Sequence, residues 1–173
     1  MESVKQIIRD VPDFPKEGII FKDITPLLGD PVAFQKTINS LKDRYADKSV
    51  DAVVGVEARG FIFASALAYA LGTGVVMVRK PGKLPYKTFQ ETYSLEYGSD
   101  TVEIHQDALR PGQNIIVIDD VLATGGTLSA TLDLIRKNFK NVNILETAFL
   151  IELDFLKGRE KLKGTPVYSM IHF

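Results

Sequence analysis

The sequence contains no cysteine and only two histidines, His105 and His172, in 173 residues. The absence of cysteine excludes disulfides, thiolate metal ligands and cysteine nucleophiles. With two histidines, a histidine-rich metal site is also not expected. Any catalytic or binding site must therefore be built from other residue types.

The sequence also lacks a long apolar run and a dominant charge. No segment approaches the length needed to cross a bilayer. The opening segment, MESVKQIIRDVPDF, mixes acidic and basic side chains where a secretory signal would have an apolar core. A formal net charge of −1 argues against a broadly basic nucleic-acid-binding face but permits a local basic cluster for a small anion. We expect a soluble cytoplasmic protein that binds neither nucleic acid nor membrane.

The remaining composition is that of a globular protein, with 45% hydrophobic and 25% charged residues. The length fits one domain that spans residues 1–173. The apolar patterns predict strands at 52–57, 75–80, 114–119, 142–153 and 166–173. They predict helices at 2–10, 30–45, 60–71, about 127–138 and 154–162. A loop at 81–91 is expected to lead into a hairpin at 92–105. Because strands alternate with helices, the predicted fold is a doubly wound α/β sheet, mostly parallel, with helices on both faces and an inserted hairpin.

One stretch, IIVIDDVLATGGT at 115–127, joins a buried strand to a helix through two acids and a glycine pair. The first turn of such a helix offers unpaired backbone N–H groups and the positive end of the helix dipole, which together bind anions. Glycines let the backbone close around a phosphate, threonine hydroxyls can donate to it, and a small alanine leaves room for its oxygens. The predicted phosphate-binding residues are Ala123, Thr124, Gly125, Gly126 and Thr127.

The two acids, Asp119 and Asp120, would repel that phosphate and therefore need another partner. The candidates are the vicinal hydroxyls of a sugar and a hydrated divalent cation. A ligand with a phosphate at one end and a diol at the other satisfies both halves of the stretch, and ribose 5-phosphate is the simplest such group. An ordinary helix start capped by aspartate would explain a lone acid or a lone glycine pair, but the combination favours the ligand site.

Two other glycine-containing segments fail as nucleotide sites. GVEARG, residues 55–60, has the Walker A glycine spacing but continues into Phe61, where a lysine and a hydroxyl residue are required. GTGVVM begins like a dinucleotide fingerprint at Gly72 but places Met77 at the third glycine position and precedes a strand. A P-loop NTPase and a nicotinamide-dependent dehydrogenase are thereby excluded.

Two further strand ends carry charged residues that suit a second anion. VEARGF places Glu57, Arg59 and Gly60 at the start of a helix, where an arginine and free amides could hold a diphosphate. VRKPGKLPYK adds the basic residues Arg79, Lys80, Lys83 and Lys87 after the next strand. Such a cluster alone would usually be solvated surface, but beside two anion-binding strand ends it favours neutralisation of a diphosphate.

Glu96 lies in YSLEYG, beside the predicted loop. It is either an outward-facing strand residue or, if the loop closes and excludes water, a group suited to acid–base work. The sequence leaves its role open among acid, base and hydrogen-bond partner.

Together these segments resemble the type I phosphoribosyltransferases, with VIDDVLATGGT as the fingerprint for phosphoribosyl diphosphate (PRPP). The resemblance covers essentially the whole chain, and other segments point to the adenine-specific branch of the family. They are PDFPKEGIIFKDITPLL, VEARGF, RKPGKLP, YSLEYG and FLKGREKL. The resemblance implies transfer of the phosphoribosyl group from PRPP to adenine, giving AMP and diphosphate, with Mg²⁺ bound mainly through PRPP and water. It also implies a homodimer in which a basic residue, here Arg79, reaches the neighbouring site.

The resemblance also assigns residues to parts of the substrates. Residues 123–127 would bind the 5-phosphate, Asp119 and Asp120 the ribose hydroxyls, and Glu96 would exchange a proton with the purine. The residues assigned to the diphosphate are Glu57, Ala58, Arg59, Gly60, Arg79, Lys80 and Lys83. Those assigned to adenine are Val121 and, in an N-terminal hood of about residues 1–30, Ile20, Phe21 and Lys22. Lys22 replaces an arginine and Ala58 a serine of some members, which affects fine affinity rather than function.

Two alternatives remain open. The fingerprint also permits a type I enzyme for hypoxanthine, xanthine or orotate, although PDFPKEG and YSLEYG disfavour it. A PRPP-sensing regulator without catalysis is disfavoured because the sequence has no spare length for a helix-turn-helix domain and a net charge of −1.

We predict that Glu96→Gln lowers the turnover number far more than the affinity for PRPP, because a proton-transfer group acts in the reaction step. Asp120→Asn, the comparison variant, should mainly weaken PRPP binding, because it changes a group assigned to the ribose hydroxyls. Steady-state kcat and the KM for PRPP distinguish the two defects. Unchanged turnover in Glu96→Gln would remove that residue from acid–base duty.

Overall fold

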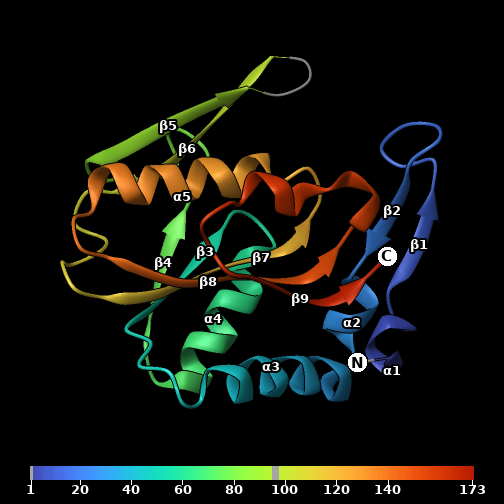
Figure 1. The fold of residues 1–173 in the computed structure, drawn as a ribbon. Coiled ribbons are helices and arrows are strands. Elements are labelled where there is room, and N and C mark those ends of the chain that lie inside the picture. Colours follow the sequence, from blue (N-terminus) through green and yellow to red (C-terminus); the bar gives the residue numbers. More distant parts are fainter. Residues whose placement is uncertain (1, 95–97) are drawn as a thin grey trace. The chain divides into compact units, whose positions relative to one another are not determined.

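The computed structural model describes residues 2–94 and 98–173, so Met1 and residues 95–97, which include Glu96, lie outside the described residues (Figure 1). The chain divides into two compact units, Met1–Arg44 and Tyr45–Phe173. The first unit carries a small antiparallel sheet and the second the main parallel sheet. Among the described helices, none is both long enough and apolar enough to cross a membrane.

The first unit begins with short elements and ends in a long helix. Its elements are α1 (Glu2–Lys5), β1 (Arg9–Pro12), β2 (Ile20–Asp23), α2 (Thr25–Gly29) and α3 (Pro31–Tyr45), the last of which ends on the first residue of the second unit. The start of α3 is capped by Asp30. A carboxylate oxygen of Asp30 accepts hydrogen bonds from the backbone amides of Val32 at 2.9 Å and Ala33 at 3.0 Å.

The helix predicted over residues 2–10 is wrong in its second half. Arg9 and Asp10 belong instead to β1, where they pair with Asp23 and Lys22 of β2. Cross-strand ion pairs accompany this pairing, with 3.7 Å between Arg9 and Asp23 and 2.6 Å between Lys22 and Asp10. Strand pairing therefore overrides the local helical period.

The second unit is built on a parallel sheet with the strand order β4-β3-β7-β8-β9. The strands are β3 (Ala52–Val56), β4 (Gly74–Val78), β7 (Asn114–Leu122), β8 (Asn143–Glu152) and β9 (Val167–His172). Every neighbouring pair in this sheet is parallel, which confirms the predicted doubly wound fold. Helix α4 (Gly60–Leu71) connects β3 to β4, and α5 (Gly126–Asn138) connects β7 to β8.

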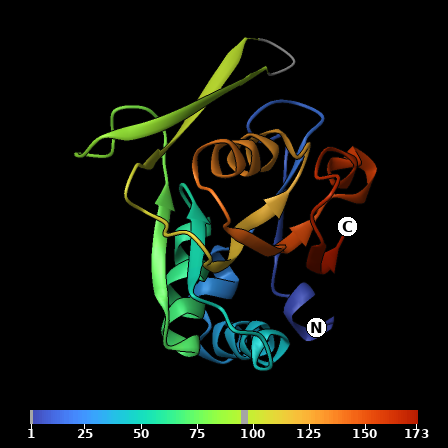
Figure 2. The same ribbon diagram turned by 60° about the vertical axis from the view of Figure 1, so that its left-hand side comes forward.

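The two helices cover opposite faces of this sheet, with α5 above it and α4 below it in Figure 1; Figure 2 gives a second view. Gly55 of β3 faces α4, because a Cβ placed on it would lie 2.6 Å from the Cβ of Ala64. Its neighbours Val54 and Val56 belong to the buried cluster that contains Leu132 of α5. The central strands are thus buried on both faces, as their nearly unbroken apolar sequences require.

A separate antiparallel hairpin, β5 (Thr88–Ser94) and β6 (Ser99–His105), packs against α5. The loop predicted at 81–91 is wrong at its end, because Phe89 packs edge-to-face on Phe139 with ring centroids 5.6 Å apart and the strand already begins at Thr88. The sequence GSD at 98–100 predicts the turn of the hairpin at these residues, which is wrong because Ser99 and Asp100 already belong to β6.

The short helix predicted at 154–162 is instead two 3₁₀ turns, η1 (Asp154–Leu156) and η2 (Gly158–Lys161). Lys157 between them has a φ of 53°, and this left-handed conformation interrupts a continuous helix. The other helix and strand boundaries differ from the predicted ones by one or two residues, apart from the end of β7.

We predict that Gly55→Ala lowers the free energy of unfolding by about 1–3 kcal/mol, because the added methyl group overpacks the contact between β3 and α4. Gly74→Ala is the matched control, since Gly74 begins β4 and a Cβ there meets no atom within 4 Å. Its unfolding free energy should stay within about 0.5 kcal/mol of the wild type. Urea titrations followed by circular dichroism measure both values. Equal effects of the two substitutions would contradict tight packing at Gly55.

Candidate functional site

The candidate site lies where the chain connections of the main sheet change direction. From β3 the chain passes through α4 to β4 on one side, and from β7 it passes through α5 to β8 on the other. Neighbouring strands whose connections diverge leave a crevice at their carboxyl ends, and open α/β sheets bind ligands there. The ends of β3 and β7 are therefore the first place to expect a ligand.

β7 extends beyond β3 at this crevice. The last residue pair between the two strands is Gly55 with Ile118, whereas β7 continues to Leu122 by pairing with β8. The strand end predicted at residue 119 is therefore wrong, because pairing with β8 keeps the chain extended. Asp119 and Asp120 lie in this overhang, beside the end of β3.

The predicted phosphate-binding residues follow β7 and line one pocket of about 80 Å³. Gly125 has a φ of 76°, in the left-handed region that favours glycine, and the next residue begins α5. The first amides of a helix have no intrahelical acceptor and are available to an anion. The pocket is lined by Asp119, Val121, Leu122, Ala123, Thr124, Gly125, Gly126, Thr127 and Leu128. The structure thus brings all the predicted phosphate-binding residues together with one of the aspartates.

Asp120 is buried and Asp119 is partly exposed, and the two carboxyls have different partners. Asp119 Oδ1 accepts a hydrogen bond from the backbone amide of Asp120 at 2.8 Å, and Arg59 Nε lies 2.7 Å from Asp120 Oδ2. Burial raises the pKa of both carboxyls; the charge of Asp120 raises the pKa of Asp119 further, while Arg59 opposes the rise at Asp120. The carboxyl oxygens of this pair can accept hydrogen bonds from the hydroxyl groups of a ligand.

The segment from Glu57 to Gly60 joins β3 to α4 and reaches β7. A Cβ on Gly60 would lie 2.8 Å from Asp119 Oδ1 and 3.0 Å from the carbonyl oxygen of Ile118, so a side chain here would push the helix start away. Ala58 is exposed and follows a cis peptide bond from Glu57. The close approach at Gly60 brings the start of α4 beside the aspartate pair.

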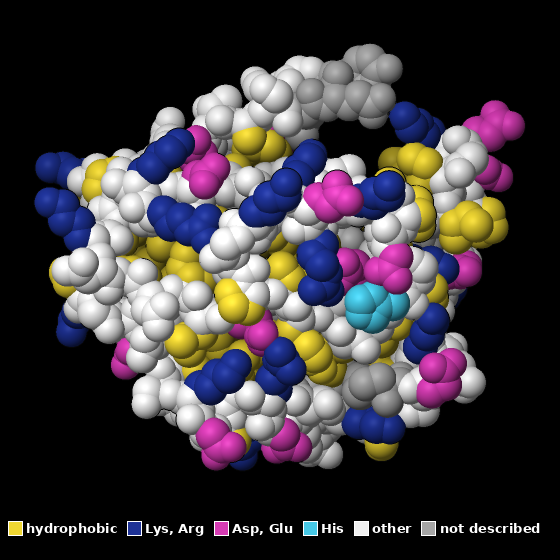
Figure 3. Space-filling model, in the orientation of Figure 1, with side chains coloured by type: hydrophobic (Ala, Val, Ile, Leu, Met, Phe, Trp, Pro, Cys, Tyr) yellow, Lys and Arg dark blue, Asp and Glu magenta, His cyan; other side chains and the backbone are white. Residues whose placement is uncertain are grey.

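Glu57 gathers the basic residues that follow β4. Its carboxylate accepts hydrogen bonds from Arg79 at 3.3 and 3.2 Å, from Lys83 Nζ at 2.8 Å and from the backbone amide of Lys80 at 2.8 Å. Burial acts to raise the pKa of Glu57, but these hydrogen bonds outweigh it and lower the pKa from 4.5 to about 2. Glu57 is therefore a charged counter-ion of the predicted diphosphate-binding cations. Figure 3 shows basic and acidic side chains similarly interspersed over one face of the molecule.

Two residues of the hairpin, Tyr93 and Asp100, join this group and were not predicted from the sequence. Asp100 forms an ion pair with Lys80 and accepts a hydrogen bond from the Tyr93 hydroxyl at 3.1 Å. The same hydroxyl lies 2.9 Å from Thr127 Oγ1. The hairpin thus connects the basic loop to the predicted phosphate loop. No local spacing in the sequence signals this connection, because its members come from four separate segments.

The remaining predicted residues are Glu96 and three residues of the first unit. Glu96 lies outside the described residues. Ile20, Phe21 and Lys22 belong to β2 of the first unit, where the ring of Phe21 packs on Phe14 with centroids 5.2 Å apart. Their assignment to adenine therefore stays a prediction.

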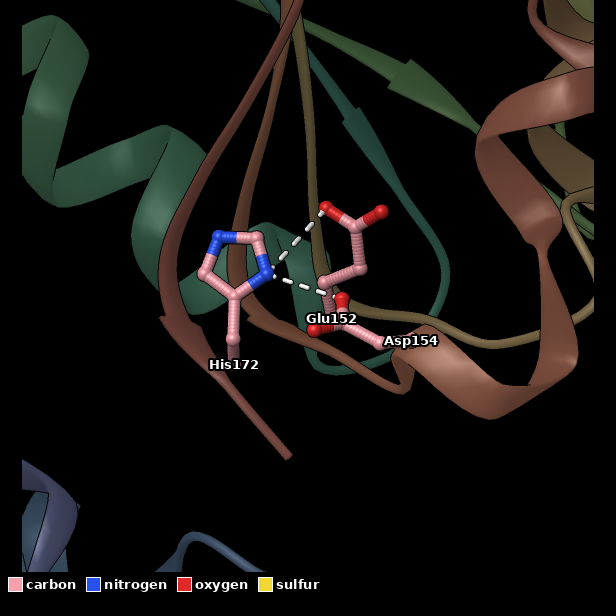
Figure 4. A group of neighbouring side chains, drawn as sticks. All are labelled: Glu152, Asp154 and His172. Atoms are coloured by element: carbon pink, nitrogen blue, oxygen red, sulfur yellow. Dashed lines mark hydrogen bonds and ion pairs between the residues drawn. The ribbon is translucent and has the colours of Figure 1, made fainter.

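The described residues contain one group with metal-ligand spacing, formed by Glu152, Asp154 and His172 at the ends of β8 and β9 (Figure 4). His172 Nδ1 lies 2.8 Å from Asp154 Oδ1 and 3.9 Å from Glu152 Oε2. Arg159 and Ser169 also bind Glu152. Because these side chains satisfy one another, we interpret the group as a hydrogen-bond network that includes the ion pair between Arg159 and Glu152.

We predict that Glu57→Gln makes the stability of the protein less sensitive to acid. The folded-state pKa of Glu57, about 2, lies below its ordinary value of 4.5, so folding stabilises the charged form. This stabilisation is fully present above pH 4.5 and is lost as the pH falls through the folded-state value of about 2. Urea unfolding at about pH 6 and about pH 3 should show a larger loss of unfolding free energy in the wild type than in Glu57→Gln.

Glu160→Gln, at an exposed position, is the control for this comparison and should keep the acid sensitivity of the wild type. Equal losses in the wild type and Glu57→Gln would contradict the role of Glu57 as a charged counter-ion.

The chain is similar to a known family of enzymes over most of its length. Residues 32–167 match the family model described as Phosphoribosyl transferase domain. The adenine phosphoribosyltransferase of Syntrophotalea carbinolica is 56% identical over 173 residues, which cover 100% of both chains. The crystal structure of adenine phosphoribosyltransferase from Thermoanaerobacter pseudethanolicus matches with a TM-score of 0.94 and 48% identity, and 99% of each chain is covered.

A further relative has been solved with ligands. The crystal structure of adenine phosphoribosyltransferase from Saccharomyces cerevisiae is complexed with D-2,5-dideoxy-2,5-imino-altritol 1,6-bisphosphate and adenine. It matches with a TM-score of 0.91 and 44% identity over 98% of this chain and 97% of that chain. The likeness therefore extends over the whole chain and is not confined to the crevice. The chain belongs to the phosphoribosyltransferase family, and within it to the adenine phosphoribosyltransferases.

Proposed function

We propose that this protein transfers the 5-phosphoribosyl group of PRPP to adenine, giving AMP and diphosphate in purine salvage. The observation that carries the proposal is the group at the ends of β3, β4 and β7, which combines a helix-start pocket, an aspartate pair and clustered cations. Each of the three suits one part of PRPP. Membership of the adenine phosphoribosyltransferases supports adenine as the acceptor.

The sugar phosphate is assigned to the end of β7. The loop at residues 123–127 binds the 5-phosphate through the amides at the start of α5 and the hydroxyls of Thr124 and Thr127. Asp119 and Asp120 bind the ribose hydroxyls. Both carboxyls lie at the end of β7 and Asp119 lines the same pocket as the loop, which supports this assignment, because their oxygens can accept hydrogen bonds from hydroxyl groups.

The diphosphate is assigned to the residues that follow β3 and β4. Here Glu57 and Asp100 already hold the cations in place. An incoming diphosphate replaces these carboxylates as the partner of the cations, so the positive charge that binds it is already in place. The residues proposed to act on the diphosphate are Glu57 as counter-ion, the amides of Ala58 and Gly60, and the side chains of Arg59, Arg79, Lys80 and Lys83.

The reaction breaks the bond between ribose C1 and the diphosphate and forms one between C1 and a nitrogen of adenine. The sugar passes through an oxocarbenium-like state, so catalysis requires stabilisation of the departing anion and orientation of the attacking nitrogen. The cations after β4 supply the first requirement. Asp119 and Asp120 hold the sugar. The attacking ring nitrogen of adenine loses its proton as the new C–N bond forms, and Glu96 is proposed to exchange a proton with the purine in this step.

Mg²⁺ is proposed as the cofactor. The carboxylates at the crevice, Asp119 and Asp120, are hard oxygen donors, so the residues present fit this ion. Most of its ligands would come from the diphosphate and hydroxyl oxygens of PRPP and from water. When bound, the ion supplies further positive charge against the diphosphate.

Adenine is assigned to Ile20, Phe21, Lys22 and Val121. Two observations support this assignment. The yeast relative has been solved with adenine and a bisphosphate together. Val121, for its part, lines the pocket of the phosphate loop, so a base joined to the sugar lies near it.

We further propose that residues 1–173 act as one cytoplasmic phosphoribosyltransferase domain that forms a homodimer and has no nucleic-acid or membrane partner. Exposed apolar side chains on α4 and β4 support an interface between subunits. They are Ile62, Tyr69, Val75 and Met77, with exposed fractions from 39% to 90%. Arg79, the residue proposed to reach the neighbouring site, follows β4 directly.

We predict that the purified protein converts adenine and PRPP to AMP. Guanine, hypoxanthine or orotate should react at least about 10²-fold more slowly, because a site built for the hydrogen bonds of one base leaves polar groups unpaired with another. Removal of Mg²⁺ with a chelator should lower the rate. Liquid chromatography of the nucleotide products measures each reaction. Faster turnover of guanine or orotate than of adenine would overturn the acceptor, and retention of specific DNA at moderate salt would support a regulator instead.

A further inference from the structure

The segment Asp154–Leu162 has no part in the reaction proposed above, although it packs against the loop assigned to the 5-phosphate. A Cβ on Gly158 would overlap the carbonyl oxygen of Ala123 and lie 3.0 Å from the backbone nitrogen of Gly125. A Cβ on Gly125 would in turn overlap the carbonyl oxygen of Gly158. Two stretches of main chain therefore touch with no side chain between them.

Arg159, the residue after Gly158, connects this segment to the main sheet through hydrogen bonds. Its guanidinium donates to both carboxylate oxygens of Glu152, from Nε at 3.0 Å and from Nη2 at 2.5 Å. Its Nη1 donates to the carbonyl oxygen of Val167 at 2.8 Å, and Ser169 Oγ donates to the Glu152 carboxylate at 2.5 Å. One side chain thereby joins η2 to the end of β8 and to β9.

Glu152 is a firm anchor because it is buried at the last position of β8, where it is 5% exposed. The hydrogen bonds from Arg159 outweigh burial and lower the pKa of Glu152, so its carboxylate is charged at neutral pH. A bidentate pair between arginine and carboxylate fixes orientation as well as distance. The position of Gly158, next to Arg159, is therefore set by the sheet.

We propose that Arg159 and Glu152 are positioning residues for phosphate binding: the pair holds Gly158 against residues 123–127 and so keeps the loop amides in the geometry that receives a 5-phosphate. The inference rests on the proposed role of that loop. A loop that is already ordered loses less freedom when a ligand binds, so the pair contributes to the affinity for phosphorylated ligands.

This role predicts a selective defect. In Arg159→Met, the KM for PRPP and the Kd for AMP should rise about tenfold, because a bidentate charged pair is lost. The kcat and the KM for adenine at saturating PRPP should change by less than about twofold, because the phosphate is held equally in the ground state and the transition state. Arg159→Lys keeps the charge without the fork and should lie between.

Gly158→Ala tests the contact without changing the ion pair and should give the same selective rise. Two controls match these variants. Gly74→Ala adds a methyl group that meets no atom within 4 Å. Lys137→Met changes a residue in the last turn of α5 and removes its 2.5 Å ion pair with Glu91. Both controls should keep the wild-type KM for PRPP. Thermal unfolding midpoints of all variants separate a loss of stability from a loss of affinity.

Steady-state kinetics and calorimetry with AMP and adenine decide the matter. Weaker PRPP and AMP binding with unchanged adenine binding in Arg159→Met and Gly158→Ala supports the proposal. Unchanged phosphate affinity, or an equal loss for adenine, overturns it; if Arg159→Met does not fold, Arg159→Lys and Gly158→Ala decide. The wild type is measured first. If it does not turn over adenine with PRPP, the proposed function itself is refuted. If it does and the variants keep its phosphate affinity, only the positioning role is refuted.

Discussion

The candidate site depends on one constraint: β7 continues past the end of β3 while it stays paired with β8. The extra residues keep the strand geometry of the sheet, so Asp119 and Asp120 have fixed places beside the start of α4. The turn into α5 follows immediately, which sets the pocket next to the aspartates. Groups placed on strand ends and helix starts are held more rigidly than groups on long loops, and the site gains its order from this.

Charge at the site is balanced within the protein. Glu57 binds Arg79 and Lys83, and Asp100 binds Lys80. Clustered cations repel one another, and these carboxylates offset that repulsion while holding the side chains close together. In the proposed site, binding of a diphosphate would be an exchange of partners, in which the cations release the protein carboxylates and bind the ligand.

The parts of the fold and site that could be predicted from the sequence are those with local signals. The strand, the acids and the glycine pair of residues 115–127 are neighbours in the chain, so their pattern indicates both the crevice and its chemistry. The roles of Tyr93, Asp100 and Arg159 could not be predicted, because their partners lie in other segments and tertiary packing alone brings them together. The helix predicted over residues 2–10 failed for the same reason, since pairing with β2 decided its second half.

The contact between Gly125 and Gly158 limits how the sequence can change. When two side chains clash, a smaller residue on one side can compensate for a larger one on the other. Here each glycine faces a backbone carbonyl, which every residue has and no substitution removes. A side chain gained at either position therefore has no compensating change at the other, so the contact restricts both positions to glycine.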